Sequence, residues 1–177
     1  LLERLQKAVQ DLPVSIPADK TLARVRQEIS LLSLKDDITE ELDRLDTHLQ
    51  AIDDALAEAG PASGTVHINA HGTGTVKNDR LESRAIARAF GSQSPVTSTK
   101  SMTGHLLGAA GALETIASIL ALLRDEVPPT VGTSELDPHI DIDVVLKSSR
   151  KTKLARAVSL SLGFGGHNAC LILDKAT

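Results

Sequence analysis

One long apolar run limits the folds that are open to this chain. Residues 106–123 read LLGAAGALETIASILALL and carry a single charged side chain, Glu114. The glycines and alanines near the start cost helix propensity and provide no bulky face, so a helix over 105–124 is best explained by close packing on several sides. A membrane span needs about 20 apolar residues, and no run here approaches that length. We therefore expect a core helix inside a layered domain.

The residues around this run alternate between strand and helix patterns. Strands are predicted at 65–70 and in SPVTS, and a helix is predicted over 78–90 with a capping box formed by Asp79 and Glu82. Three further strands are predicted in IDVVL, ARAVSLSLG and NACLIL. Alternation of this kind predicts an α/β domain with a mixed sheet covered by helices.

The first part of the chain shows helical apolar spacing instead. Leucines, isoleucines and a valine recur at steps of three and four, which predicts two amphipathic helices separated by the polar KDD segment. Asp37 and Glu40 form a capping box for the second helix, and a shorter helix, LLERLQKAVQ, comes before the pair. We expect an α-helical hairpin or short coiled coil over 1–51 and an α/β domain over 52–177.

Charge and composition exclude several function classes. Residues 1–60 hold 7 Lys/Arg and 13 Asp/Glu, a net charge of -6, whereas residues 61–177 hold 12 and 10, a net charge of +2. An acidic front half is a poor surface for phosphates, and a chain with two aromatic residues has no stacking platform for bases. The single cysteine, Cys170, excludes an internal disulfide, and without a signal-like segment we expect a cytoplasmic protein.

Three polar residues are candidates for chemistry. His71 follows a predicted strand in AHGTGT, His105 stands at or near the first turn of the apolar helix, and Lys100 lies just before it. A helix N-terminus disfavours an imidazolium, and two neutral rings aimed at one point would stabilise an oxyanion or enolate. The alternative is that each histidine is structural. His67 and His71 share no helix face, so a zinc site is not expected.

Three motifs occur in an order and spacing that resemble a known family. INAHGTGT followed by ND, then STKSMTGHLLGAAGALE, then SLGFGGHNACLIL are similar to the C-terminal half of the β-ketoacyl-acyl carrier protein synthases, which are condensing enzymes of the thiolase fold. The resemblance runs from about residue 52 to residue 173. It implies one half of a thiolase-like layered α/β fold.

The same resemblance implies an activity and a site. Members of the family join an acyl group on an active-site cysteine to a malonyl unit on acyl carrier protein, with loss of carbon dioxide. His71 and His105 then resemble the catalytic pair, Lys100 the lysine near the second histidine, and Glu114 the buried carboxylate of the central helix. The resemblance places Asp79 in a structural role and implies no cofactor and no metal. The implied substrate-pocket residues are Phe164, Gly163, Gly165, Thr73 and Thr75.

The nucleophilic cysteine of the family has no counterpart among these residues. Cys170 lies in the last predicted strand, matches no nucleophile motif and is expected to be an inert, buried side chain. Without a thiolate nothing holds the acyl group, so the chain alone should not complete a condensation. We expect a homo-oligomer or a complementing chain that carries the cysteine half, because the apolar helix otherwise leaves an exposed patch.

A second resemblance covers the helical segment. Residues 24–50, RVRQEISLLSLKDDITEELDRLDTHLQ, are similar to the C-terminal region of the YicC-type endoribonucleases, so the chain reads as a chimera joined near 50–56. An RNA-processing module is therefore one alternative function, and a non-catalytic assembly module is another. The positions with a metal or RNA role under the first alternative, or solvated helix faces otherwise, are Arg24, Gln27, Glu28, Glu40, Glu41 and His48.

Overall fold

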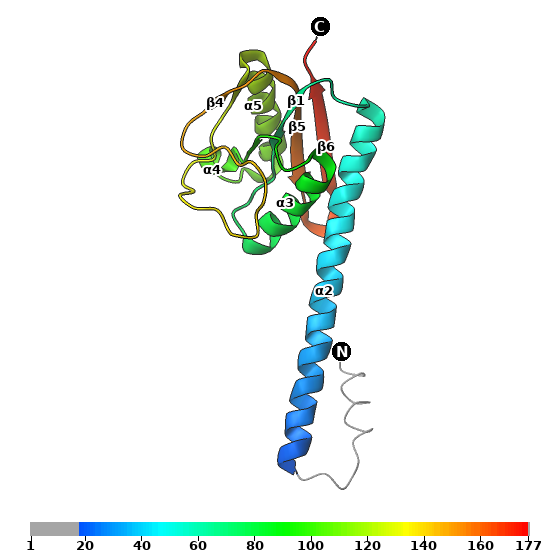
Figure 1. Ribbon diagram of the computed structural model, residues 1–177. Coiled ribbons are helices and arrows are strands. Elements are labelled where there is room, and N and C mark those ends of the chain that lie inside the picture. Colours follow the sequence, from blue (N-terminus) through cyan, green and yellow to red (C-terminus); the bar gives the residue numbers. More distant parts are fainter. Residues whose placement is uncertain (1–17, 177) are drawn as a thin grey trace. The chain divides into compact units, whose positions relative to one another are not determined.

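The computed structural model describes residues 18–176, except for the side chains of residues 18–26, 28, 29 and 164. The predicted helix LLERLQKAVQ lies outside these residues. Contacts divide the chain into two compact units between Asp43 and Arg44. The elements, labelled in Figure 1, are α2 (Ala18–Ala59), β1 (Thr65–Asn69), α3 (Val76–Phe90), β2 (Val96–Thr97), α4 (Lys100–Thr103), η1 (Leu107–Ala109), α5 (Ala110–Arg124), β3 (Glu126–Val127), β4 (Arg150–Lys151), β5 (Leu154–Leu162), η2 (Phe164–Gly166) and β6 (Asn168–Asp174).

A mixed sheet of four strands forms the centre of the second unit. Its order is β2-β1-β5-β6, with β1 parallel to β2 and β5, and β6 antiparallel to β5. The predicted α/β class and four of the predicted strands are confirmed. IDVVL is the exception, because Val144 bridges Val96 while Leu146 bridges Thr130. The segment changes partner within a few residues, so no continuous ladder forms.

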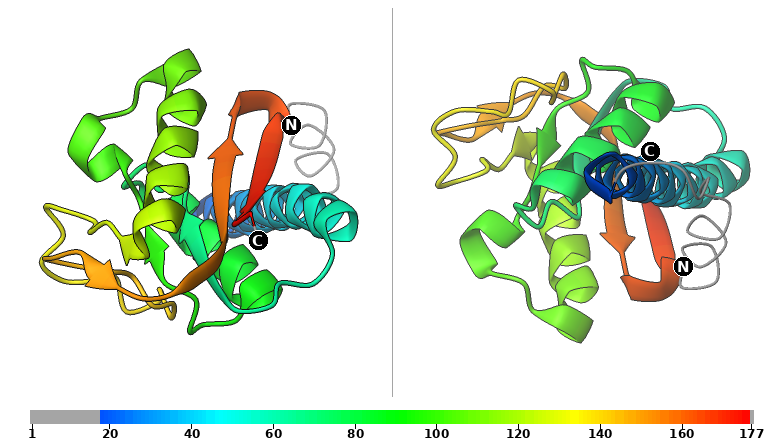
Figure 2. Two further views of the ribbon diagram at one scale, coloured as in Figure 1. Left: turned by 90° about the horizontal axis from the view of Figure 1, so that it is seen from above. Right: turned by 90° about the horizontal axis from the view of Figure 1, so that it is seen from below.

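Helices cover both faces of this sheet (Figure 2). Side chains of a strand alternate between the two faces, so neighbouring residues join different cores. On one face Ile68 packs in a cluster with Ile52 of α2 and Ile86 of α3. On the other face Leu122 of α5 packs in a second cluster with Ala157 of β5. The second unit is therefore a helix–sheet–helix sandwich, which confirms the layered arrangement.

α5 is buried on one side only. Its buried residues include Glu114, Ser118 and Leu122, whereas Ile116 is 55% exposed and Leu123 is 68% exposed. The prediction of close packing on several sides is therefore wrong within the described chain. The helix packs mainly on β5, and its opposite side carries an apolar row consisting of Ala112, Ile116, Ile119, Leu120 and Leu123.

The helix also starts later than its apolar run. Leu107 has a φ of 50°, and a short 3-10 turn precedes Ala110, where α5 begins. By length and composition, Leu107–Arg124 could cross a membrane, with a mean hydropathy of 1.5, contrary to the expectation that no run approached this length. However, α5 itself is 15 residues long, about 22 Å, and the hydrocarbon core of a bilayer is ~30 Å thick. Its contacts with β5 are those of a core helix.

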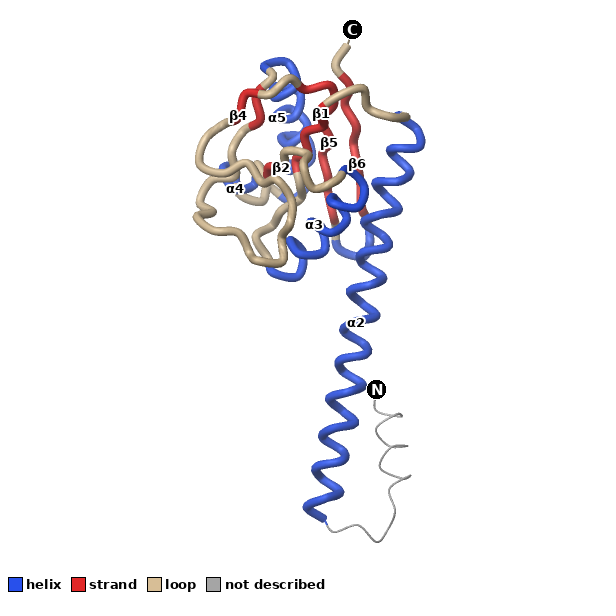
Figure 3. Tube along the Cα trace, in the orientation of Figure 1, coloured by secondary structure: helices blue, strands red, loops and turns tan. Residues whose placement is uncertain are grey.

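α2 is one continuous helix where two were predicted (Figure 3). The KDD segment lies inside it, and all three side chains are exposed. Lysine and aspartate do not break helices as glycine and proline do, so a polar segment that faces water leaves the helix intact. Asp37 is therefore a mid-helix residue, and its predicted capping role is wrong.

The last turns of α2 belong to the core of the second unit. Leu49 is 6% exposed and Ile52 is 1% exposed, both within the cluster that includes Ile68. The helix ends at Ala59, and the next residue, Gly60, has a φ of 71° and donates its N–H to the carbonyl of Leu56. The apolar residues of α2 keep their steps of three and four across the division between Asp43 and Arg44. Their spacing therefore does not indicate where one unit ends and the next begins.

The predicted capping box of α3 is replaced by a different arrangement. α3 begins at Val76, and its N-cap residue is Thr75, which makes no side-chain cap bond. Asp79 accepts a hydrogen bond from the side chain of the adjacent Asn78 at 3.2 Å and is not the N-cap. Glu82 is turned inward and has other partners, so it does not cap the helix.

Glu82 anchors the HGTG loop that follows β1. Its side chain is buried, and its two oxygens accept the backbone N–H groups of His71 at 2.6 Å and Gly72 at 2.8 Å. Burial raises the pKa of Glu82 to about 7, against the lowering effect of these donors. Gly72 has a φ of 42°, and a Cβ there would lie 2.5 Å from the Cβ of Ser98. The loop is therefore fixed from both sides.

Replacement of Glu82 by glutamine should loosen this loop. A carboxamide offers one acceptor oxygen to two N–H donors, so one donor stays buried without a partner and the free energy of unfolding should fall by about 1–3 kcal/mol. Amide hydrogen exchange at His71 and Gly72 should become faster. Glu126→Gln, which changes a surface ion pair with Lys151, is the matched control and should alter stability by less than about 1 kcal/mol. Equal stability of the two variants would contradict the anchoring role.

His67 should make the fold sensitive to acid. Its side chain is fully buried on β1, neither ring nitrogen has a hydrogen-bond partner among the described residues, and burial lowers its pKa to about 4. As the pH falls below about 6.5, His67 binds a proton in the unfolded chain but stays neutral in the folded chain. The free energy of unfolding should therefore decrease as the pH falls from about 6.5 to about 4, by up to ~3 kcal/mol.

His67→Leu should remove this contribution and flatten the pH dependence of urea unfolding between pH 7 and pH 4. His139→Leu changes an exposed histidine and should leave the acid slope largely intact. A slope that His67→Leu does not change would assign the acid sensitivity to other groups.

Candidate active site

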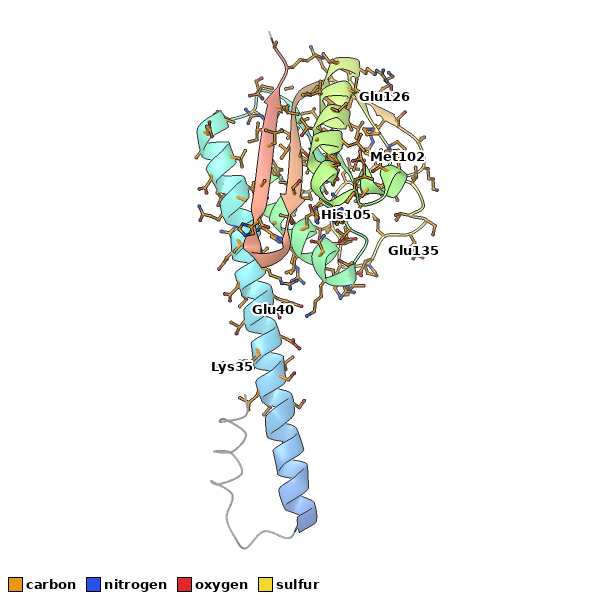
Figure 4. The ribbon with its side chains drawn as sticks, turned by 180° about the vertical axis from the view of Figure 1, so that it is seen from behind. Lys35, Glu40, Met102, His105, Glu126 and Glu135 are labelled. Carbon is orange, nitrogen blue, oxygen red and sulfur yellow. The ribbon has the colours of Figure 1, made fainter. Side chains whose placement is uncertain are left out.

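His71 and His105 are brought together although they come from different parts of the chain. Their ring centroids lie 5.5 Å apart, with an angle of 86° between the ring planes. His71 follows β1 and is 9% exposed, whereas His105 is exposed in the loop between α4 and η1. Figure 4 labels His105 near the start of α5. The distance places both rings within reach of one small acceptor.

The first turn of α5 does not hold His105, contrary to the sequence prediction. The helix starts at Ala110, because Gly104 at φ 72° and Leu107 at φ 50° turn the chain away from a helical path. Local bonding orients the ring instead. Its Nδ1 accepts the backbone N–H of Leu107 at 3.2 Å, so the ring proton lies on Nε2, which is then a hydrogen-bond donor.

The surroundings of His71 keep its ring neutral. Burial, and then the neighbouring Lys100, His105 and His48, lower the pKa of His71 to about 4. A neutral imidazole at neutral pH donates one hydrogen bond and accepts another. The ring can therefore polarise a carbonyl oxygen without first releasing a proton to solvent.

Lys100 forms a buried ion pair with Glu114. The ammonium group donates to Glu114 Oε1, and the two side chains are 4% and 2% exposed. The second carboxylate oxygen of Glu114 is buried with no partner among the described residues. The pair links α4, where Lys100 lies, to α5, and places a fixed positive charge close to His71.

A network around Asn69 holds these elements in register, and the sequence motifs did not predict it. Asn69 is the last residue of β1, and its amide donates to Thr99 Oγ1 at 3.1 Å and to the carbonyl of Glu114 at 3.2 Å. The backbone N–H of Thr99 donates back to Asn69 Oδ1 at 3.3 Å. A polar residue at the end of a buried strand, two positions before His71, is the signal that could have revealed this network.

A cavity of about 620 Å³ opens beside the histidine pair. Thr73, Lys100 and His105 line it from one side, as do Asp79 and Glu82. Residues of the segment 130–144 form another wall, and Arg80 of α3 holds this wall through hydrogen bonds to Asp137 at 2.8 and 2.9 Å. The cavity is large enough for a small thioester.

Other residues of the predicted pocket lie outside this lining. Thr75 shares a hydrogen bond of 3.0 Å with Thr73 but does not line the cavity itself. Gly163 and Gly165 are in the turn between β5 and β6, where a Cβ on Gly163 would lie 2.7 Å from the carbonyl oxygen of His167. The side chain of Phe164 is outside the described part of the chain.

Cys170 lies on β6, half-buried, and burial raises its pKa to about 11. A thiol with such a pKa carries almost no thiolate at neutral pH. The expectation that this cysteine is not a nucleophile agrees with its position and surroundings.

The candidate positions of the helical segment do not form a cluster of metal ligands among the described residues. Gln27 and Glu40 are exposed, Glu41 is half-buried, and His48 is buried with a pKa lowered by burial and then by Arg44. The side chains of Arg24 and Glu28 lie outside the described part of the chain. The role of these positions stays a prediction.

Comparison with known proteins identifies the family. The family profile described as "Beta-ketoacyl synthase, C-terminal domain" matches residues 30–134. The 3-oxoacyl-[acyl-carrier-protein] synthase 2 of Coxiella burnetii is 47% identical over 125 residues, which cover 68% of this chain and 30% of that protein. The enzyme of the same name from Synechocystis is 46% identical over 130 residues, with 71% and 31% covered. The chain thus spans about a third of the length of these relatives.

Solved structures give the same result. The ishigamide ketosynthase/chain length factor superposes with a TM-score of 0.71 at 38% identity, covering 75% of this chain and 34% of that one. A beta-ketoacyl synthase from Burkholderia phymatum gives a TM-score of 0.71 at 36% identity, with 75% and 33% covered. These likenesses agree with the family profile, and the chain belongs to the β-ketoacyl synthase family, of which it contains the C-terminal domain.

Proposed function

We propose that this chain supplies the histidine side of a decarboxylative condensation that extends fatty-acid or polyketide chains. The observation that carries the proposal is the 5.5 Å separation of His71 and His105 beside a cavity that His105 lines. His71, His105 and Lys100 are the proposed catalytic residues. Thr73 and Thr75, with the turn that contains Gly163, Phe164 and Gly165, are the proposed contacts of the substrate.

The geometry suggests how a malonyl thioester would react. The bond between the α-carbon and the carboxylate breaks, carbon dioxide leaves, and the electron pair moves onto the thioester oxygen to form an enolate. Nε2–H of His105 and the neutral ring of His71 would donate hydrogen bonds to that oxygen as its charge develops. Burial, and then the charge of Lys100, would keep His71 neutral, and Glu114 would hold the Lys100 ammonium group in place.

The acyl acceptor requires a nucleophile from outside these residues. The pKa of Cys170 is raised to about 11, and it lies on β6, so it does not serve as the thiolate that the condensation needs. The partners that we propose are an acyl carrier protein, which brings the acyl and malonyl thioesters, and the cysteine-bearing half of the synthase. One related structure is described as a polyketide acyl carrier protein in complex with its ketosynthase. A cytoplasmic location would suit such partners.

The apolar row of α5 is the proposed contact surface for the cysteine-bearing half. Ile116, Leu120 and Leu123 are 55%, 41% and 68% exposed, and no charged residue interrupts the row before Arg124. An uncovered row of this kind favours association. The chain covers only 30% of its Coxiella burnetii relative, so most of the relative's length is available to cover this surface.

RNA processing by the helical segment stays the alternative. No observation on the described residues favours it over the condensing function, and the histidine pair lies in the second unit, outside most of the helical segment. Cleavage of RNA that depends on Mg²⁺ or Mn²⁺ would support it.

The enzymatic proposal predicts decarboxylation of malonyl-N-acetylcysteamine, a small thioester that needs no docking protein. His71→Ala and His105→Ala should each lower the rate of carbon dioxide release by roughly 100-fold, because each removes one donor to the enolate oxygen. His139→Ala is the control, since His139 is an exposed histidine that does not line the cavity. Equal release from all four proteins would reject the proposal.

The proposed association predicts that α5 governs complex formation. Ile116→Glu combined with Leu123→Glu should abolish binding to a separately produced cysteine-bearing half of a 3-oxoacyl-[acyl-carrier-protein] synthase 2, measured by native mass spectrometry. Leu31→Glu combined with Leu34→Glu makes the same chemical change at positions that are 59% and 56% exposed on α2, and should leave the complex intact. A homodimer that the first variant disrupts, with no binding of the added half, would favour self-association instead.

A further inference from the structure

Residues 131–143 form one wall of the cavity as a single irregular loop, drawn in yellow in Figure 1. The loop contains no helix or strand, and none of its residues is buried. Backbone hydrogen bonds nevertheless fix both of its ends. The N–H of Thr130 donates to the carbonyl of Val145 at 2.7 Å, and the N–H of Asp143 donates to that of Ser92 at 3.0 Å. A loop with fixed ends and no buried side chain can move without disturbing the sheet.

One carboxylate holds the middle of this loop in two ways. Asp137 Oδ1 accepts the backbone N–H of His139 at 2.9 Å and lies 2.9 Å from Nδ1 of the same residue, so it closes a turn inside the loop. Asp137 Oδ2 accepts the Nε–H and Nη2–H groups of Arg80, on α3, at 2.9 and 2.8 Å. Among the described residues outside the loop, only Arg80 has a side chain that is hydrogen-bonded to residues 132–142.

The inner side of the loop covers apolar side chains. Leu136, Ile140 and Ile142 of the loop are half-buried and line the cavity. The same lining includes Ile86 and Val96, which are 1% and 3% exposed. Displacement of the loop would bring this lining into contact with water. The hydrophobic effect therefore favours the closed position that the structure shows.

The bond between Arg80 and Asp137 has the strength of a reversible contact. The two side chains are 37% and 24% exposed, and ion pairs with this much solvent contact favour the paired state by less than about tenfold. Such a pair keeps the loop closed for most of the time and still lets it open. Hydrogen bonds from the N–H of His139 and then from Arg80 hold the pKa of Asp137 far below its usual range. The carboxylate thus stays ionised near neutral pH, and the pair is sensitive to salt.

We propose that residues 131–143 form a lid that controls access to the cavity, and that the Arg80–Asp137 pair is its latch. The lid swings about its fixed ends, and Gly132, with a φ of 78° and open space around it, lies next to one of them. Opening admits a substrate, and closure excludes water from the cavity beside the histidine pair. Arg80 and Asp137 are therefore positioning residues and not catalytic ones. Such a lid is independent of the reaction that is proposed for the cavity.

Access to the cavity can be measured with a thiol probe. Ser83 lines the cavity and is 4% exposed, so Ser83→Cys places a thiol in the cavity with little change in size. Ser118 is fully buried on α5 and does not line the cavity, so Ser118→Cys is the matched control. Both changes are made in the full chain together with Cys170→Ala, which removes the natural thiol. Mass spectrometry gives the rate of alkylation by N-ethylmaleimide, which is proportional to the open fraction.

The lid predicts a specific order of rates. Arg80→Gln should speed alkylation of the thiol from Ser83→Cys by about three- to tenfold, because it removes the latch. Arg80→Lys keeps the charge and should restore most of the protection. His139→Ala alters only the turn inside the lid and should change the rate by less than about twofold. A rise in salt from about 50 mM to about 500 mM should speed alkylation when Arg80 is present and not in Arg80→Gln.

Two results would overturn the lid. One is an unchanged rate in Arg80→Gln. The other is equal acceleration of the thiols from Ser83→Cys and Ser118→Cys, which reports a loosening of the whole fold. If circular dichroism shows that Arg80→Gln does not fold, the chain with Arg80 decides, because a rate that salt does not change would also overturn the latch. None of these measurements uses a substrate, so failure of the lid can be told from failure of the proposed condensation.

Discussion

The buried ion pair between Lys100 and Glu114 is the interaction on which the arrangement of the site depends. It joins α4 to α5 in a region where an unpaired charge would be costly, of the order of 3–5 kcal/mol once a partner is lost. Asn69 adds the end of β1 to the same point through its bonds to Thr99 and the carbonyl of Glu114. Strand, short helix and long helix are thereby fixed together, and the loops that carry His71 and His105 start from fixed ends.

This arrangement explains why α5 has two unlike sides. One side holds Glu114 and Ser118 and faces the polar end of β1, while the other side holds Ile116 and Leu123 and is bare. Residues of the two sides of α5 alternate along the sequence, so residues 106–123 look uniformly apolar when read as a sequence. The two sides are distinguished by Glu114, the one carboxylate of α5, which is buried and paired with Lys100. One side of α5 thus belongs to the polar network around Asn69, whereas its other side is apolar and exposed.

The sequence predicted regular elements better than it predicted their ends and partners. The strands of the main sheet follow from their alternating apolar residues, and His71 and His105 were found because the motifs around them resemble a family. The continuous α2 was missed because polarity at KDD was taken as a break, although no glycine or proline occurs there. The position of His105 was missed because Leu107 adopts a positive φ that its residue type does not indicate, so that α5 begins only at Ala110. Glu82 has the spacing of a capping residue, and only its burial beside the HGTG loop reveals its real partners.

Gly72 has a consequence that reaches beyond its own turn. A Cβ there would lie 2.5 Å from the Cβ of Ser98, and Ser98 in turn donates its hydroxyl to the carbonyl of Gly72 at 2.8 Å. The backbone of Gly72 thus approaches the side chain of Ser98 until only a hydrogen atom fits between them. The spacing between the loop of His71 and the segment that leads to Lys100 is therefore set by the size of the smallest side chain. Any other L-residue at this position would act as a spacer, widening the gap between the two walls of the site.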